Sequence, residues 1–148
     1  CGAIYANNMN SWMVYGPFSL ADASQAQLNA HLWVNTETGW DFACLMASID
    51  GSHFYTSNAG TCFSGSSGGN FVATRLDLSD VYTLGNLLGQ PQVWIAAVFT
   101  SDGSFSYAEG AHVDDLLVRK CVGGTCAGAA IDAPGGALLA QTKELQRP

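Results

Sequence analysis

Two adjacent aspartates, Asp114 and Asp115, lie in the β-branched, apolar run AHVDDLLVRKC near the end of the chain. Neighbouring side chains of a strand point to opposite faces of its sheet, so we expect one carboxylate to face the interior. Before Arg119 the only basic residue is Arg75, against ten acidic residues. A bound cation would satisfy an inward carboxylate. The alternative is that Asp114 accepts backbone N–H bonds at a sheet edge while Asp115 faces water.

Catalytic motifs are weak in this sequence. The stretch GSSGG, Gly65 to Gly69, matches the hydrolase pattern G-x-S-x-G. A nucleophile elbow, however, needs a strand before its serine and a helix after it, whereas Ser67 is expected in a Gly/Ser loop that leads into a strand. No H-E-x-x-H motif of zinc proteases is present. Asp50 and Asp77 have the positions of turn and strand-end residues, which argues against a glycosidase pair. We therefore expect no enzyme activity.

Aromatic side chains are the main indication of a ligand, because sandwich modules stack sugars on exposed rings. Trp40 and Tyr55 lie beside predicted turns and are the better candidates, and with Tyr107 they form the candidate platform. Trp33 and Trp94 lie in apolar runs, which predicts that they pack in or near the core.

The five cysteines indicate an oxidising, extracellular location. Cys121 and Cys126 enclose a Gly-Gly turn in CVGGTC, which suits a short disulfide, and Cys44 and Cys62 lie on successive predicted strands and form a second candidate pair. Cys1 is then left over, which suggests an intermolecular bond. The spacings contain no zinc signature.

Composition excludes several classes of protein. The chain has 148 residues, of which 48% are hydrophobic and 11% charged, and its net charge is −7. No basic patch exists to neutralise phosphates, so a nucleic-acid partner is excluded. No apolar run approaches the roughly 18–20 residues of a membrane-spanning helix. A globular domain remains.

Short strands dominate the predicted secondary structure. Turn signals recur at intervals of about 8–12 residues, which predicts an antiparallel sandwich. Residues 61–70 read as a Gly/Ser loop, and residues 78–89 as a single helical turn between strands. Strands are expected at 10–20, 26–37, 41–50, 52–57, 71–79, 92–102 and 111–121.

The fold class predicted is all-β, an antiparallel two-sheet, jelly-roll-like β-sandwich over residues 1–126. Residues 127–148 form an Ala/Gly-rich C-terminal extension. Such a tail has little side chain to bury, so we expect that it packs back onto its own domain or adds as a strand to a neighbour.

Four segments carry a resemblance to a known family: WDFACLMASIDGSHFY, RLDLSDV, QVWIAAVFTSDGS and EGAHVDDLLV. In this order they resemble the MAM-like, jelly-roll domain of bacterial extracellular proteins, a module that also accompanies immune-inhibitor-A-type secreted metallopeptidases. The resemblance covers Asp41 to Val118 and implies a two-sheet sandwich without a catalytic centre. Such domains have strand sequence ahead of YANNMNSWMVYGPF, so we expect the tail or another subunit to fill that place.

The resemblance also implies a structural cation, usually calcium, bound in part by an aspartate of the closing strand. It places Asp114 as a ligand, with Asp41 and Asp102 as partners from neighbouring strand ends and Glu109 and Asp115 as weaker choices. Calcium takes six to eight oxygen ligands, which these carboxylates would supply in part. No EF-hand pattern is present, so this expectation depends on the resemblance.

The sequence therefore predicts a non-catalytic extracellular protein with a structural or adhesive role. We expect a surface, fibre or filament subunit that self-associates through strand and tail contacts. The alternative is a carbohydrate-binding or substrate-targeting module of a larger secreted hydrolase, with a glycan as its partner.

Overall fold

The computed structural model describes residues 3–106, 109–124 and 137–148. These residues form ten antiparallel strands and no helix, which confirms the all-β class. The strands are β1 (Asn10–Phe18), β2 (Gln25–Asn35), β3 (Phe42–Ser48), β4 (His53–Tyr55), β5 (Cys62–Ser66), β6 (Val72–Asp77), β7 (Val93–Thr100), β8 (Gly110–Cys121), β9 (Ala137–Gln141) and β10 (Glu144–Gln146).

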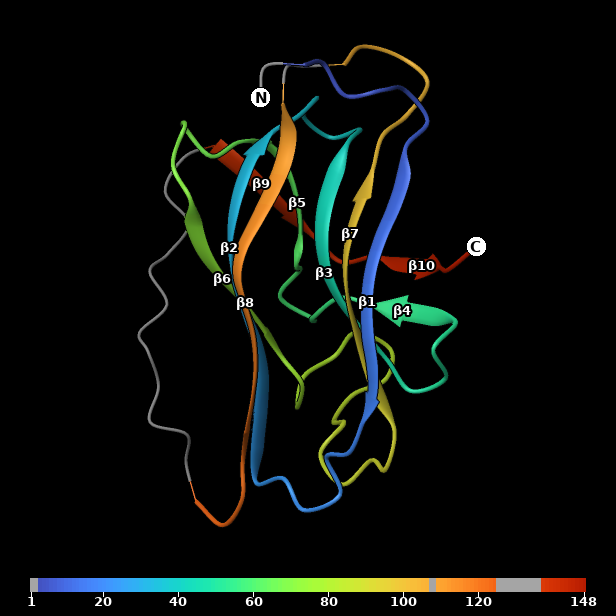
Figure 1. The fold of residues 1–148 in the computed structure, drawn as a ribbon, viewed down its shortest axis with the longest axis vertical. Helices are drawn as coiled ribbons and strands as arrows, with labels where there is room; N and C mark the ends of the chain where they lie inside the picture. Colours follow the sequence, from blue (N-terminus) through green and yellow to red (C-terminus); the bar gives the residue numbers. More distant parts are fainter. Residues whose placement is uncertain (1–2, 107–108, 125–136) are drawn as a thin grey trace.

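The strands form a two-layer sandwich (Figure 1). The first layer has the order β1-β7-β3 and is extended by β4 and β10, while the second layer has the order β8-β2-β6. Strand β5 links the layers, because it pairs with β3 at Cys62 and Phe63 and with β2 at Ser66. Strand β9 pairs with β5.

Hydrophobic alternation in β2 fixes which face meets the core. Ala26, Leu28, Ala30, Leu32 and Val34 are buried at every second position. This period of two is expected for a strand with one covered face. The same core contains side chains of β3 and β7, so it lies between the two layers.

Strand β3 is buried at all seven positions because both of its faces are covered. Leu45 faces the core between the layers. Cys44 and Met46 face the other way and belong to a second apolar cluster with Phe54, against which Trp12 of β1 packs. The continuous apolar run in the sequence reflects this double burial.

Two local predictions are wrong. Residues 61–70 were expected as a loop, but Cys62–Ser66 form β5, in which Ser64 is fully buried. Small residues fit there because β5 crosses between the layers. Residues 78–89 form turns and bridges instead of a helical turn. Leu78, Val81 and Leu87 anchor them in the core.

The described end of the tail packs on its own domain, which was one of the two expectations. Strand β9 extends β5, and β10 pairs with β4. Leu145 contacts the second apolar cluster, and Lys143 Nζ lies 3.3 Å from the ring centroid of Phe42. The end of β9 also approaches the loop before β5 closely, because a Cβ at Gly60 would lie 2.9 Å from the backbone of Gln141.

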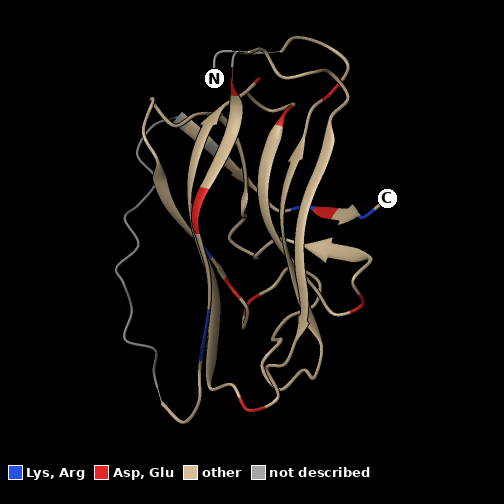
Figure 2. Ribbon diagram, in the orientation of Figure 1, with Lys and Arg blue, Asp and Glu red and all other residues tan. Residues whose placement is uncertain are grey.

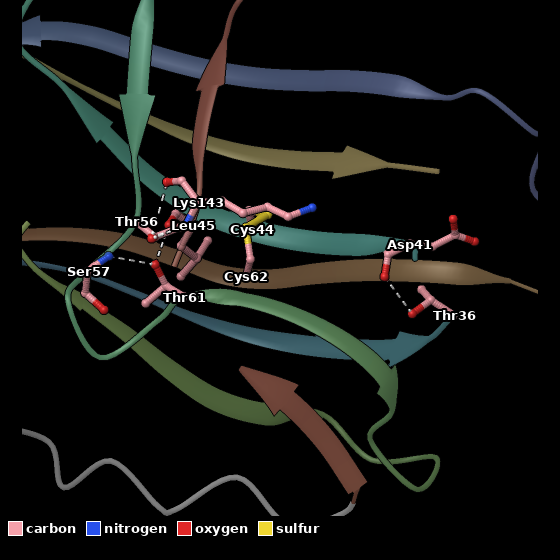
Figure 3. Close-up of a disulfide and its surroundings, with 9 residues drawn as sticks. All are labelled: Thr36, Asp41, Cys44, Leu45, Thr56, Ser57, Thr61, Cys62 and Lys143. Atoms are coloured by element: carbon pink, nitrogen blue, oxygen red, sulfur yellow. Dashed lines mark hydrogen bonds between the residues drawn. A yellow bond between two sulfur atoms is a disulfide. The ribbon is translucent and has the colours of Figure 1, made fainter. Parts of the chain in front are cut away.

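A disulfide joins Cys44 of β3 to Cys62 of β5, as the sequence predicted (Figure 3). Cys121 is also disulfide-bonded. Cys126, its predicted partner, and Cys1 lie outside the described residues.

The part of the chain that the structure describes holds no helix long and apolar enough to cross a membrane.

Candidate functional site

Three carboxylates converge at one end of the sandwich. Glu37, Asp41 and Asp102 each offer one oxygen, and these oxygens all lie within 4.8 Å of one another. Glu37 follows the end of β2, Asp41 precedes β3, and Asp102 follows β7. Figure 2 shows acidic segments at this end of β3 and β7. The ends of three strands therefore position the group.

The turn between β2 and β3 is held rigidly. The backbone N–H groups of Trp40 and Asp41 both donate to the Glu37 carbonyl, at 3.2 and 3.1 Å. The Thr36 hydroxyl donates to the Asp41 carbonyl at 3.2 Å (Figure 3), and the Ser64 hydroxyl donates to the Glu37 carbonyl at 2.9 Å. These bonds tie the turn to itself and to β5.

Asp41 is fully buried, and both of its carboxylate oxygens accept hydrogen bonds. Oδ1 accepts the backbone N–H of Asp102 at 2.8 Å, and Oδ2 accepts the hydroxyl of Tyr5. The two bonds fix the direction of the carboxylate and the distance between the β3 and β7 ends.

Glu37 is the least satisfied member of the group. Its Oε2 is buried and has no hydrogen-bond partner among the described residues. Burial, and then the negative charges of Asp102 and Asp41, raise the pKa of Glu37 above its usual value. No described Lys or Arg forms an ion pair with any of the three carboxylates. Among the described residues, the group thus gathers negative charge with no cationic side chain paired to it.

This arrangement suits a hard divalent cation. All three side chains offer oxygen, the ligand atom that calcium and magnesium prefer, and none offers nitrogen or sulfur. A cation would neutralise the repulsion that raises the Glu37 pKa and would give Glu37 Oε2 a partner.

Two of the residues that the resemblance places at the cation site, Asp41 and Asp102, lie together in this group. The resemblance missed Glu37, although Glu37 precedes Asp41 by four residues in ETGWD and a tight turn brings the two together. Glu109, Asp114 and Asp115 do not belong to the group.

The expectation that Asp114 or Asp115 faces the interior is wrong, because both are exposed. The pairing of β8 with β2 shifts register at this point, and Asp115 has a φ of 50°, so a β-bulge interrupts the alternation. Asp114 Oδ1 accepts the Asp115 N–H at 2.8 Å, and Asp115 Oδ2 lies 3.2 Å from Nδ1 of His31. The structure thus matches the alternative expectation, in which Asp114 accepts a backbone N–H bond and Asp115 is exposed to water.

Two residues of the candidate aromatic platform, Trp40 and Tyr55, lie apart in the structure. Trp40 is 63% exposed just before β3, whereas Tyr55 pairs with Ala47 near the other end of β3. At about 3.3 Å per residue, the strand from Phe42 to Ala47 alone spans roughly 16 Å, which separates the two. Tyr55 is half-buried and donates its hydroxyl to Glu144 at 3.1 Å. Tyr107 lies outside the described residues.

The remaining chemical candidates have structural contacts. Ser67 is 2% exposed, and its hydroxyl oxygen accepts the N–H of Val34 at 3.1 Å. Asp50 accepts the N–H groups of the hairpin turn that follows it. Asp77 accepts the N–H of Ser79 at 2.8 Å.

A second feature is that the sandwich is open along one side. Met13 and Tyr15 of β1 pair with Ala97 and Ile95 of β7, so all four lie on the face of the layer that meets the core. Met13 is nevertheless 52% exposed and Tyr15 63% exposed. The second layer ends at β8 and leaves this part of β1 uncovered.

An apolar groove of about 240 Å³ follows this open side. Met13 of β1 and Val113 of β8 form its two rims, and Leu32, Ala97 and Phe99 line it between them. None of its lining residues is charged. Within the described residues β8 pairs with β2 alone and β1 with β7 alone (Figure 1), so each strand has one unpaired edge. Both strands contribute residues to the groove.

No protein-family model matches the chain, and no curated protein matches its sequence.

Proposed function

We propose that this chain is a non-catalytic extracellular module with a structural or adhesive role, a surface, fibre or filament subunit that assembles through strand contacts. The observation that carries the proposal is the open side of the sandwich. The edges of β1 and β8 flank an uncharged groove, and Met13 and Tyr15 are exposed on a core-facing surface. Unpaired strand edges of this kind are templates for another chain.

The proposal depends on the sandwich edges and not on the tail. Residues 137–148 are already used within the domain, as β9 on β5 and β10 on β4. One edge of each tail strand is therefore already occupied within the domain, by β5 and by β4.

An extracellular location agrees with the covalent structure. The Cys44–Cys62 disulfide joins two neighbouring strands inside the apolar cluster. Structural disulfides persist in oxidising environments and are rare in the cytosol.

We assign a structural cation, calcium, to Glu37, Asp41 and Asp102. Its role would be to hold the β2–β3 turn against the β7 end, which the Asp41–Asp102 hydrogen bond already joins. The negative net charge of −7 leaves the chain with an excess of carboxylates, of which this group is the most concentrated that the described residues contain.

Light scattering after size-exclusion chromatography tests the assembly. The chain should elute as oligomers whose mass rises with protein concentration, and EDTA or a reductant should change that distribution if calcium or disulfides act between subunits. A monomer of constant mass under all these conditions would refute the proposal.

A second candidate function is supported by Trp40. Its ring is 63% exposed and directly precedes Asp41 of the carboxylate group, so an aromatic surface lies beside the candidate cation site. Sugars bind to such rings by stacking. Glycan-array binding that Trp40→Ala abolishes would favour a carbohydrate-binding module. Absence of binding, or binding that the variant retains, would remove this candidate.

A further inference from the structure

The exposed edge of β8 has a charge pattern that is complementary to itself. Its first half carries Asp114 and Asp115, and its second half carries Arg119 and Lys120. Figure 2 shows this division along the strand, acidic in one half and basic in the other. Within the chain, Asp115 lies 3.2 Å from His31 and Lys120 donates to Asp22 at 2.5 Å, so Asp114 and Arg119 are the pair that the inference uses. In an antiparallel pair of two identical strands, the acidic half of each lies opposite the basic half of the other.

We propose that the open side is closed by a second copy of this chain, through antiparallel pairing of β8 with β8 about a two-fold axis. This inference rests on the proposed function, because it names the partner and the edge through which the subunits associate. Such an interface is isologous: the same patch serves both subunits, and each contact occurs twice.

The β-bulge sets the register. In the second half of β8, Leu116 and Val118 alternate with Leu117 and Arg119, and Val118 faces the core. Before the bulge, Val113 faces the core side and Asp114 the outer side, because they pair with Leu32 and His31 of β2. Only residues that share a face pair directly, so the register has to skip one residue at Asp115.

Among the registers that meet this condition, one also places Asp114 opposite Arg119. Leu117 lies on the two-fold axis opposite its own copy, and Leu116 lies opposite the second copy's Val118. After the skip at the bulge, Asp114 lies opposite the second copy's Arg119. In each pair the two residues lie on the same face of the sheet: the core side for Leu116 and Val118, and the outer side for Asp114 and Arg119. The charged pair occurs twice in the dimer. The side chain of Leu117, which is 47% exposed in the single chain, then lies in the interface.

The same register brings an apolar side chain to the groove. If the alternation of β8 continues past its end, the second copy's Val122 lies opposite Ala111, which lines the groove. Val122 is 62% exposed in the single chain. Its burial there would cover the opening between β8 and Met13, and removal of such apolar surface from water is the main driving force of association.

Charge also favours a second copy at this side of the molecule. The chain has a net charge of −7, so two copies repel each other in general. Residues 1–21 contain no charged side chain, and all of β1 is uncharged (Figure 2). The open side therefore combines an uncharged strand with a strand whose Asp114 lies opposite Arg119 in the self-paired arrangement.

Cysteine cross-linking tests the axis. Directly opposed residues of an antiparallel pair have Cα atoms about 4.5–5.5 Å apart, which a disulfide spans. Leu117→Cys should form a disulfide-linked dimer in air at protein concentrations where the wild-type chain shows only background linkage from its own cysteines. The matched control is Arg75→Cys, on the exposed face of β6, the other edge strand of the same layer. It should remain at background.

Charge reversal tests the register. Arg119→Glu and Asp114→Lys should each raise the dimer dissociation constant by roughly tenfold or more, because each opposes like charges twice. An equimolar mixture should recover dimers, since the heterodimer has opposite charges at both positions. Circular dichroism checks that Asp114→Lys, which loses its bond to the Asp115 N–H, still folds. If it does not fold, the cross-linking result decides.

The outcomes separate this inference from the proposed function. Selective cross-linking at position 117 and recovery in the mixture support it. Self-association of the wild-type chain without selective cross-linking would overturn the β8 interface and leave the proposed function standing. A wild-type chain that stays monomeric, with cross-linking at background, would refute both.

Discussion

Replacement of Glu37 by glutamine should separate the cation site from the rest of the fold. The substitution keeps the size of the side chain and removes one negative charge from the group that Asp41 and Asp102 complete. With EDTA present, Glu37→Gln should melt at the same temperature as the wild-type chain or higher. The reason is that Glu37 Oε2 has no partner and its charge is opposed by two others.

Calcium should then stabilise the wild-type chain and not the variant. Extracellular modules bind calcium with dissociation constants of about 0.1–1 mM, so about 10 mM calcium stabilises a folded state by roughly 1.4–2.7 kcal/mol. In a domain of this size about 1 kcal/mol moves the melting temperature by about 2–4 °C, which gives a calcium shift of about 3–11 °C. Glu37→Gln should lose most of this shift.

Differential scanning calorimetry in calcium and in EDTA measures the effect. Glu109→Gln is the matched control, since it makes the same chemical change at a glutamate outside the group, and it should keep the full shift. A wild-type shift of zero, or an equal loss in both variants, would refute the assignment of the cation to these carboxylates.

The pH dependence in EDTA has a definite sign. The pKa of Glu37 is raised above 4.5 in the folded chain. Between pH 4.5 and that raised pKa, Glu37 is therefore protonated in the folded chain and ionised in the unfolded chain. The stability that this carboxyl contributes is therefore present below pH 4.5 and is lost as pH rises through the raised pKa. The advantage of Glu37→Gln over the wild-type chain should grow through the same window; a constant difference would contradict it.

Three further predictions concern stability, measured by urea denaturation. Replacement of Cys44 and Cys62 by alanine removes a crosslink over 18 residues and should cost about 3 kcal/mol on the chain-entropy model; an unchanged free energy of unfolding would contradict it. Hydrogen bonds from the following turn hold the pKa of Asp50 well below its usual value, so Asp50→Asn should cost about 1 kcal/mol at neutral pH. That cost should fade as pH drops below about 4 and through the folded pKa; an equal cost at all pH values would be inconsistent with it. Leu145→Ala should cost about 1–3 kcal/mol if the tail is part of the domain, and no cost would show that it is not.

Much of the fold follows from local patterns in the sequence. The alternation at Leu28, Ala30, Leu32 and Val34 predicts β2 and its buried face, and the structure buries all four. Asp50-Gly51 predicts the hairpin turn between β3 and β4, where Gly51 has a φ of 74°. Such features depend on neighbours in sequence, so the sequence alone is sufficient for them.

The errors come from contacts between distant segments. The burial of β5 depends on β3 and β9, which lie far away in the chain, so CFSGS has the composition of a loop. The bulge at Asp115 reverses the face of one carboxylate, and a single backbone angle outside the strand region causes it. The alternation of apolar and polar residues along a strand contains no information about either effect.

The candidate site was predicted in part for the same reason. The resemblance supplied Asp41 and Asp102, which end up at adjacent strand ends. It did not supply Glu37, whose place in the group depends on the tight turn from Thr36 to Asp41. The open side of the sandwich was not visible in local patterns, because it is defined by the strands that flank it.

Hydrogen–deuterium exchange at low and high protein concentration tests the central claim most directly. The account predicts that amides in the middle of β8, around Leu117, exchange more slowly at high concentration, because pairing with a second copy protects the exposed edge. Amides of β6, the other edge strand of that layer, should exchange equally at both concentrations. Equal exchange of β8 at all concentrations, or protection confined to β6, would contradict association through the open side.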